Sequence, residues 1–267
     1  MKIGVFDSGI GGLTVLRELV KALPHVDFFY FGDTANVPYG TKSPDQIRSL
    51  CFSAAKVMKR QNIDGLVIAC NTASSLALDV FEKAMGKRPV MGVVEAGVQG
   101  VLLEANKRSV LVKQIPVVVF ATRATVNSGV YKKYLLKAGL SRVEEVACPL
   151  LVPMIEEGFL DHPILVKTVD WYVHQSKLIQ KLPSATEGIL LLGCTHYPWI
   201  EPLFAKRLKK WRVVNSAKTV ADQLHLLLED EAARAMPRRK SRLEFLFSDP
   251  SGLMGVPLLA KREIQRL

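Results

Sequence analysis

Two cysteines occupy the same local pattern at two places in this chain of 267 residues. Cys70 ends an apolar run at residues 65–69, and Cys194 ends a second apolar run at residues 188–193. An acidic residue and a glycine open both segments, and hydroxyl-bearing residues follow both thiols. A buried strand that ends in a thiol, beside the free N–H groups of the next helix, is a place for chemistry on an anion. The repetition predicts two thiols that face each other across one substrate.

Two opposed acid–base groups suit the removal of a proton from one face of a carbon and its delivery to the other. That reaction is a racemisation or an epimerisation. The pKa of a free thiol is about 8.5, close enough to neutrality for one cysteine to act as thiolate and the other as thiol. Cys194 with His196 also suggests acyl transfer. We expect side chains two residues apart to diverge, however, and acyl transfer leaves the second cysteine without a role.

The remaining two cysteines are interpreted as packing residues. Cys51 is expected on the inner face of a helix, and Cys148 follows a short strand and precedes Pro149. A free cysteine is often buried and behaves as a small hydrophobe. Four cysteines in this length make no disulfide framework, and the sequence has no CxxC pair or HExxH helix, so we expect no metal.

Composition favours a cytoplasmic enzyme. The chain is 49% hydrophobic, yet it has no apolar run of the roughly 18 residues that a membrane span needs, and no signal-peptide pattern opens it. We therefore expect a reducing compartment and no membrane partner.

The net charge of +11 is unevenly spread along the chain. Residues 204–242 hold eleven Lys or Arg against four Asp or Glu. Such a segment can bind nucleic acid or an acidic protein. No nucleic-acid-binding motif accompanies it, so we interpret it as a solvated helix face with a basic linker and expect no nucleic-acid partner.

Strand-like and helix-like segments alternate along the chain, and they must position these residues. Ser43 followed by Pro44, for example, predicts the start of a helix that ends near Arg60. The predicted strands cover residues 2–6, 28–31, 66–69, 90–94, 116–120, 143–146, 189–192, 213–214 and 245–247. Further predicted helices include residues 13–23, 73–85, 126–138 and 218–231. Alternation of this kind predicts an α/β fold with mostly parallel sheets flanked by helices.

The pattern restarts near residue 116, which suggests an internal duplication. We predict two pseudo-symmetric α/β domains, with the active site in the cleft between them. The first comprises residues 1–95 plus 214–267 and contains Asp7 and Cys70; the second comprises residues 96–213 and contains Thr122 and Cys194.

Six motifs, in order and spread over most of the chain, resemble those of the bacterial glutamate racemase family. They lie at residues 5–15, 31–35, 38–40, 68–74, 121–126 and 192–198. The resemblance implies a cofactor-independent enzyme that interconverts L- and D-glutamate and supplies D-glutamate for peptidoglycan. It also implies two like α/β domains with the substrate between them.

The resemblance assigns a role to each matching residue. Cys70 and Cys194 become the two acid–base catalysts. Asp7 lies beside the first and His196 beside the second, and each assists its thiol or the substrate ammonium. We give Glu156 a supporting catalytic role, against the simpler interpretation of a solvated helix acid. The expected substrate-binding residues are Asp7, Ser8, Tyr39, Gly40, Asn71, Thr72, Thr122, Thr195 and His196.

Three alternatives stay open at this point. The nearest is a racemase or isomerase of another small dicarboxylate, such as aspartate. The second is a protein that binds an acidic or nucleic-acid partner through its basic segment. The third is a pyridoxal-phosphate enzyme, although no lysine lies in a recognisable context for that cofactor. We expect no cofactor, a small-molecule substrate and a homodimer.

Overall fold

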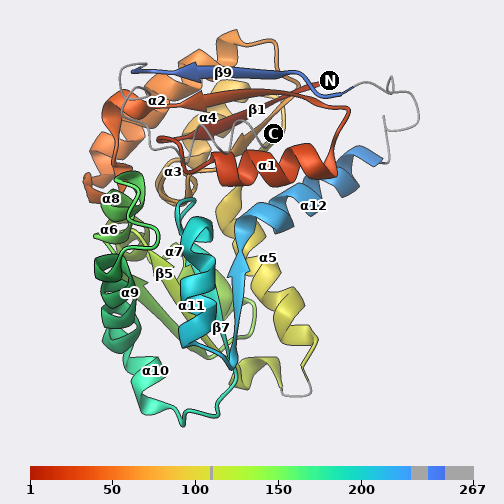
Figure 1. Ribbon diagram of the computed structural model, residues 1–267. Coiled ribbons are helices and arrows are strands. Elements are labelled where there is room, and N and C mark those ends of the chain that lie inside the picture. Colours follow the sequence, from red (N-terminus) through yellow and green to blue (C-terminus); the bar gives the residue numbers. More distant parts are fainter. Residues whose placement is uncertain (109–110, 230–239, 250–267) are drawn as a thin grey trace.

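The computed structural model describes residues 1–108, 111–229 and 240–249 (Figure 1). Some sequence predictions lie outside these residues: the last two positions of a helix predicted to end at residue 231, part of the basic segment at 230–239, and residues 250–267 of the first predicted domain.

The first sheet is wholly parallel and has the strand order β4-β3-β1-β2-β9. Its strands are apolar and three of them are largely buried, as expected where helices cover both faces of a parallel sheet. The strands are β1 (Lys2–Asp7), β2 (Asp27–Gly32), β3 (Gly65–Ile68), β4 (Val90–Gly92) and β9 (Leu243–Phe247). Its main helices are α1 (Leu13–Ala22), α2 (Pro44–Arg60), α3 (Asn71–Leu76), α4 (Leu78–Met85) and α12 (Ser216–Glu229).

The second sheet is also parallel and has the order β6-β5-β7-β8. Its strands are β5 (Pro116–Ala121), β6 (Arg142–Ala147), β7 (Gly188–Gly193) and β8 (Trp211–Asn215). Its helices are α5 (Val93–Asn106), α6 (Arg123–Ser128), α7 (Val130–Lys137), α8 (Leu151–Glu156), α9 (Pro163–Gln175), α10 (Lys177–Lys181) and α11 (Glu201–Arg207).

The two sheets repeat one topology. Pairing β1 with β5, β2 with β6, β3 with β7 and β4 with β8 turns the order β4-β3-β1-β2 into β8-β7-β5-β6, which is the second sheet. Only β9 has no counterpart among the described strands; it extends the first sheet beside β2. The predicted fold class of two like α/β units is therefore confirmed.

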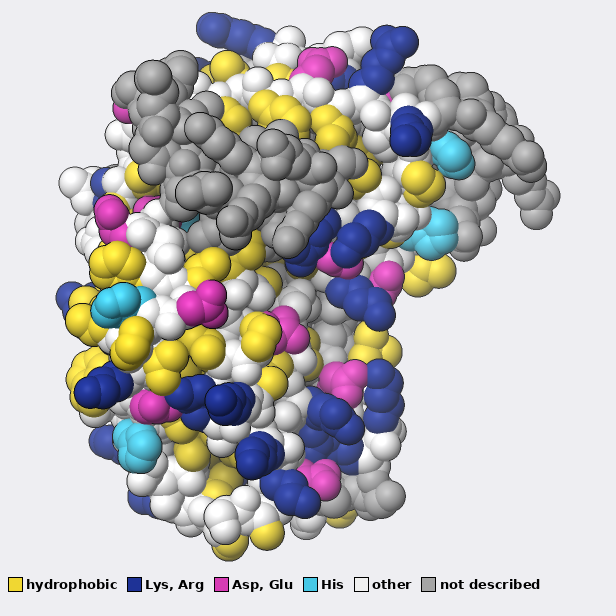
Figure 2. All heavy atoms as spheres, viewed as in Figure 1, with side chains coloured by type: hydrophobic (Ala, Val, Ile, Leu, Met, Phe, Trp, Pro, Cys, Tyr) yellow, Lys and Arg dark blue, Asp and Glu magenta, His cyan; other side chains and the backbone are white. Residues whose placement is uncertain are grey.

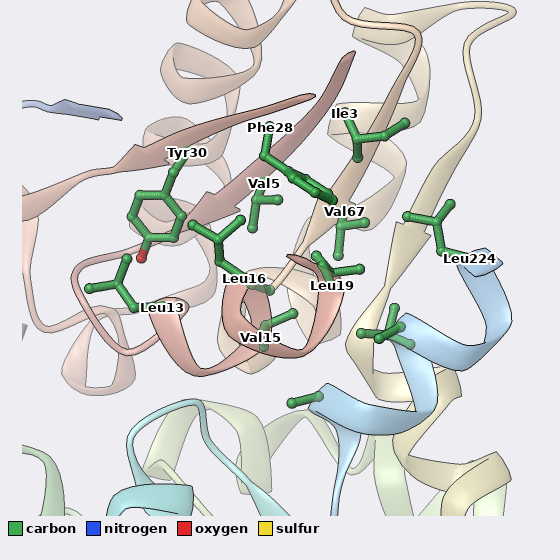
Figure 3. Close-up of a cluster of buried hydrophobic side chains, with 14 of the residues drawn as sticks. Ile3, Val5, Leu13, Val15, Leu16, Leu19, Phe28, Tyr30, Val67 and Leu224 are labelled. Carbon is green, nitrogen blue, oxygen red and sulfur yellow. The ribbon is translucent and has the colours of Figure 1, made fainter. Parts of the chain in front are cut away.

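Helix α1 covers one face of the first sheet and shows how the apolar pattern becomes a core. Its Leu16 and Leu19 are fully buried against Val5 and Phe28 of the sheet (Figure 3). These leucines recur at helical spacing, so they share one face of α1. This packing holds the start of α1, and hence the turn before it, against the carboxyl ends of the strands.

Two predicted helices are interrupted in the structure, and one predicted strand ends earlier than expected. The helix predicted at residues 73–85 is divided into α3 and α4 at Ala77, whose φ and ψ are −147° and 21°. The helix predicted at residues 126–138 begins at Arg123 and is interrupted at Gly129, whose φ of +63° lies in the left-handed region. The strand predicted at residues 90–94 ends at Gly92, and α5 begins at once.

Helices α5 and α12 connect the two units (Figure 1). Within α5, Val93 and Ala96 join the core of the first sheet, whereas Val94 and Val98 join the core of the second. Helix α12 follows β8 and packs against α1 and α5. The predicted domain boundaries fall inside α5 and β8, and the division itself stays a prediction.

Charged side chains of both signs mix on the surface. Figure 2 shows Lys and Arg concentrated on the lower half of this face, interspersed with Asp and Glu. In the basic segment, Arg207 is paired with Asp170 of α9, while Lys209 and Lys210 are exposed. Within residues 1–108, 111–229 and 240–249, no helix is both long enough and apolar enough to cross a membrane.

A buried hydroxyl links the two units near the strand ends. The Oγ1 of Thr14, in the first turn of α1, lies 2.9 Å from the carbonyl oxygen of Gly11 and 2.9 Å from that of Thr195. Thr14 is fully buried. Its hydroxyl therefore satisfies a carbonyl group that belongs to the opposite unit.

We expect Thr14→Val to lower the free energy of unfolding by about 1–3 kcal/mol, because it leaves the Thr195 carbonyl group buried without a donor. The matched control is Thr168→Val, since the hydroxyl of Thr168 only supplements the Ile164 carbonyl four residues earlier in α9. Urea unfolding of both variants measures the difference. Equal losses would contradict a special role for the Thr14 contact.

Candidate active site

The predicted chemistry-bearing residues lie at the carboxyl ends of two pairs of neighbouring strands. Asp7 ends β1 and Cys70 follows β3, while Thr122 follows β5 and Cys194 follows β7. The two sets meet at one pocket with about 590 Å³ of empty space, part of it open to solvent. It is lined by Ser8, Val37, Pro38, Tyr39, Gly40, Thr41, Cys70, Asn71, Thr72, Thr122, Arg123, Cys148, Pro149, Val152, Pro153, Glu156, Cys194, Thr195 and His196.

Cys70 lies in an environment that favours the neutral thiol. It is 5% exposed and caps α3, where its Sγ accepts a hydrogen bond from the Ala73 N–H at 3.5 Å. Its Sγ also lies 3.4 Å from Ser8 Oγ. Burial and the nearby Asp7 carboxylate raise the pKa of Cys70 to about 12, although the contacts with Ser8 and Ala73 oppose the shift. At neutral pH Cys70 therefore carries a proton that it can donate.

Cys194 lies in the opposite electrostatic environment. Its Sγ is 3.8 Å from Nδ1 of His196, and Nε2 of the same ring is 2.9 Å from Oε1 of Glu156. Burial alone lowers the pKa of His196, but the hydrogen bonds to Cys194 and Glu156 raise it to about 10. The ring is therefore positively charged at neutral pH, and this charge lies beside the Cys194 sulfur.

The expectation that Cys194 and His196 diverge was therefore wrong. Between them the chain leaves β7 and turns into the 3₁₀ helix η4 (Tyr197–Ile200), and His196 has helical φ and ψ of −81° and −29°. This turn folds the imidazole back toward the sulfur. The chain also continues differently after each thiol, since α3 starts directly after Cys70, whereas Thr195 and His196 separate Cys194 from η4.

Asp7 lies beneath the pocket rather than in its wall. It is fully buried; its Oδ2 accepts from the Gly9 N–H at 3.0 Å and its Oδ1 from the Thr195 hydroxyl at 3.3 Å. Burial raises the pKa of Asp7, and the charge on His196 counteracts this. The carboxylate thus interacts electrostatically with both Cys70 and His196. It has no exposed face for the substrate ammonium that the resemblance led us to expect.

Two turns approach each other closely at this point. A Cβ on Gly11 would lie 2.4 Å from both His196 Nδ1 and Thr195 Oγ1. The glycine after β1 is therefore required for the Thr195–His196 turn to approach Asp7.

Hydroxyl groups from both units form a second cross-unit contact in the pocket wall. The Oγ1 atoms of Thr72 and Thr122 are 2.9 Å apart, and each is about as close to Oγ1 of Thr125, at 3.1 and 3.0 Å. Gly40 packs directly on Thr122, where a Cβ would lie 2.6 Å from the threonine Cβ.

Hydrogen bonds to Asp33 hold in place the loop that carries Tyr39 and Gly40. This loop contains the 3₁₀ helix η2 (Tyr39–Thr41). Tyr39 Oη donates to the carboxylate of Asp33 at 2.6 Å, and Ser248 Oγ, just after β9, donates to the same carboxylate at 2.7 Å. The extra strand β9 therefore helps to anchor one wall of the pocket.

The structure brings together the predicted site residues Ser8, Tyr39, Gly40, Cys70, Asn71, Thr72, Thr122, Glu156, Cys194, Thr195 and His196 in one pocket wall. It also adds residues that sequence reasoning missed. Arg123 is an exposed cation in the wall, and its position directly after Thr122 was the available signal. Cys148 also lines the pocket, with its Sγ 3.5 Å from the Val146 carbonyl oxygen. Cys51 is buried in the core between α2 and the first sheet.

Comparison with known proteins gives consistent results. A sequence model of the Asp/Glu/hydantoin racemase family matches residues 3–224. The chain is 40% identical over 261 residues to a glutamate racemase of Koribacter versatilis, covering 96% of this chain and 86% of that protein. It is 40% identical over 251 residues to that of Aquifex pyrophilus, covering 94% and 90%. The crystal structure of Francisella tularensis glutamate racemase with D-glutamate has a TM-score of 0.84 at 33% identity, covering 99% of this chain and 93% of that one.

The electrostatics of Cys70 lead to a prediction about its reactivity. Below the pKa of a thiol, its alkylation rate depends on the fraction present as thiolate. Asp7→Asn removes a charge that raises the pKa of Cys70, so iodoacetamide should alkylate Cys70 several-fold faster at pH 8. Ser8→Ala removes a contact that lowers the same pKa, so alkylation should become slower.

Mass spectrometry of the Cys70 peptide, in a Cys194→Ala background, measures both rates. The two substitutions lie on the same side of the pocket but have opposite electrostatic effects. A change in the same direction for both would show that access, rather than charge, controls the reaction of Cys70.

Proposed function

Since this chain belongs to the Asp/Glu/hydantoin racemase family, and within it to the glutamate racemases, we propose that it interconverts L- and D-glutamate by proton transfer between two thiols. The resemblance drawn from the six sequence motifs is confirmed by these relatives. The proposal extends to the residues of this chain and to the part that each plays.

The observation that carries the mechanism is the opposite environment of the two thiols in one pocket. A buried carboxylate favours the protonated form of Cys70, whereas the neighbour of Cys194 is a buried imidazolium. Two-base racemisation needs this combination, because one group must accept a proton while the other donates one.

In the proposed reaction the two sulfurs share one proton, so that one is a thiol while the other is a thiolate. From L-glutamate, the Cys194 thiolate takes the α-proton: the Cα–H bond breaks, an S–H bond forms, and the electron pair moves into the α-carboxylate. The Cys70 thiol delivers its proton to the opposite face of Cα and is left as a thiolate. The reverse sequence, beginning with the Cys70 thiolate, converts D-glutamate to L-glutamate.

We propose that three residues influence the thiols without contacting the substrate's α-carbon: Asp7, His196 and Glu156. Asp7 raises the pKa of Cys70, which makes its thiolate a stronger base once it has formed. His196 carries the charge beside Cys194, and Glu156 holds the far nitrogen of that ring. Because Asp7 lies below the wall, we propose that it works mainly through Cys70 and Thr195 rather than by binding the ammonium.

The α-proton of an amino acid is weakly acidic, so the barrier must be lowered elsewhere. General acid–base catalysis contributes about 10²–10⁴-fold. We assign the rest of the rate acceleration to hydrogen-bond donors that are fixed around the α-carboxylate, which gains enediolate character as the proton leaves. We place Asn71, Thr72, Thr122 and Thr195 around one carboxylate, and Ser8 with the Tyr39–Gly40 backbone around the other, since all of them line the pocket.

The wider setting is also part of the proposal. We propose that the enzyme works in the cytoplasm, consistent with four free cysteines among the described residues, and supplies D-glutamate for peptidoglycan. Homodimer formation stays a prediction. Parallel assays with glutamate and aspartate separate the proposed substrate from the alternative dicarboxylate.

We expect Cys70→Ser and Cys194→Ser each to abolish racemisation, because a serine hydroxyl is too weak an acid–base group at neutral pH. Circular dichroism of the reaction with each glutamate enantiomer measures turnover, and exchange of the α-hydrogen in D₂O reports the separate proton transfers. Cys51→Ala is the matched control and should retain activity, since Cys51 does not line the pocket. Near wild-type turnover in either serine variant would contradict the two-thiol mechanism.

Asp7→Asn and His196→Asn should affect opposite proton transfers. The values of kcat/KM for the two enantiomers must stay equal, because the equilibrium constant is one, so the asymmetry must be sought in isotope effects. Asp7→Asn should raise the isotope effect of 2-deuterio-D-glutamate more than that of the L-enantiomer, and His196→Asn should do the reverse. Equal effects in both directions would mean that these residues only shape the pocket.

A further inference from the structure

A tyrosine outside the pocket wall reaches across to one of the wall residues. Tyr131, in the first turn of α7, donates a hydrogen bond from its Oη to Oδ1 of Asn71, at 2.5 Å. Asn71 lies in the first turn of α3, directly after Cys70, and lines the pocket. Both residues are buried: Tyr131 is fully buried, and Asn71 is 3% exposed.

This contact determines what the Asn71 amide can offer a ligand. A primary amide has an oxygen that accepts and a nitrogen that donates two hydrogens. Tyr131 occupies the oxygen, whereas Nδ2 of Asn71 is buried and has no partner among the described residues. A buried donor without an acceptor costs about 1–3 kcal/mol, so Nδ2 is a group that a bound anion can satisfy.

The phenol is placed by packing, independently of its hydrogen bond. The ring of Tyr131 lies between Gly97 of α5 and Gly193 of β7, and a Cβ on either glycine would approach the tyrosine to 3.2 Å. Burial also raises the pKa of Tyr131, so the hydroxyl keeps its hydrogen and stays a donor. Were the amide turned the other way, that hydrogen would have no acceptor among the described residues.

We propose that Tyr131 is a positioning residue, which holds the Asn71 amide with Nδ2 available to donate to a carboxylate of the substrate. This inference rests on the proposed function of the pocket. Without the hydroxyl, the amide can rotate by half a turn at little cost, because its two ends are nearly equal in size. It would then present Oδ1 to the carboxylate, and the two oxygens repel each other.

The test compares Tyr131→Phe with the matched control Tyr134→Phe, one turn further along α7. Calorimetric titration with D-glutamate measures the dissociation constant, and racemisation in both directions gives kcat and KM. We expect Tyr131→Phe to weaken D-glutamate binding and raise KM about tenfold with a smaller change in kcat. Tyr134→Phe should leave all of them unchanged, since Tyr134 does not line the pocket.

A double-mutant cycle separates positioning from a merely structural role. If Tyr131 acts through Asn71, Tyr131→Phe should cause no further loss of affinity in an Asn71→Ala background. Additive losses, or a wild-type dissociation constant in Tyr131→Phe, would overturn the inference.

Asn71→Asp supplies a second test in a side chain of the same shape, in case Tyr131→Phe fails to fold. The tyrosine can still donate to one carboxylate oxygen, but the other faces the ligand, so D-glutamate affinity should fall more than a hundredfold. Unchanged affinity would overturn the proposed orientation. A wild-type protein that binds D-glutamate without racemising it would refute the function while the binding constants still decide the role of Tyr131. A wild-type protein that does neither would overturn both.

Discussion

The close approach of two turns, one after β1 and the other after β7, is the contact on which the site depends. Gly11 leaves no room for a side chain against Thr195 and His196, and the Thr195 hydroxyl bonds to the Asp7 carboxylate. The Thr14 hydroxyl lies against the Thr195 carbonyl in the same place. The contact between the two turns brings the Asp7 carboxylate of one unit near the His196 imidazole of the other. Each thiol therefore acquires a charged neighbour, and the two neighbours are opposite in sign.

Burial gives these charges their effect. In water, a carboxylate and an imidazolium several ångströms from a thiol would be screened, whereas in a poorly solvated pocket they shift protonation strongly. Asp7 and Tyr131 are fully buried, and Cys70, Asn71, Thr195 and His196 nearly so. The same burial makes an unsatisfied donor costly, which is why Nδ2 of Asn71, without a partner in the part of the chain that the structure describes, indicates an anionic ligand.

The repeated topology explains why the residues meet but not why they differ. Both sheets place a polar residue and a thiol at the carboxyl ends of adjacent strands, as expected for ligand sites of parallel sheets. The surroundings of the two thiols have nevertheless diverged. A helix starts directly after Cys70, and its Ala73 N–H donates to the sulfur, whereas at Cys194 a histidine two residues later takes that place. One architecture thus gives its two strand ends different electrostatic surroundings.

The sequence by itself determined the parallel α/β units, the helix from Pro44 to Arg60 with its Ser43 cap, and the strands that end beside Cys70 and Cys194. These features arise from local chemistry: apolar runs, capping residues and the repetition of one motif. It also indicated which residues gather at the strand ends, because carboxyl ends of neighbouring parallel strands share one edge.

Only the tertiary structure decided how these residues face one another. The break at Ala77 carries no glycine or proline signal, and the return of His196 onto Cys194 contradicts the usual divergence of side chains two residues apart. The hydrogen bond from Thr195 to the buried Asp7 joins residues 188 positions apart in the chain. The hydrogen bond from Tyr131 to Asn71 joins residues 60 positions apart. Such contacts depend on how the two sheets pack together, and no local pattern in the chain encodes how close these residues come or what that closeness does to their charges.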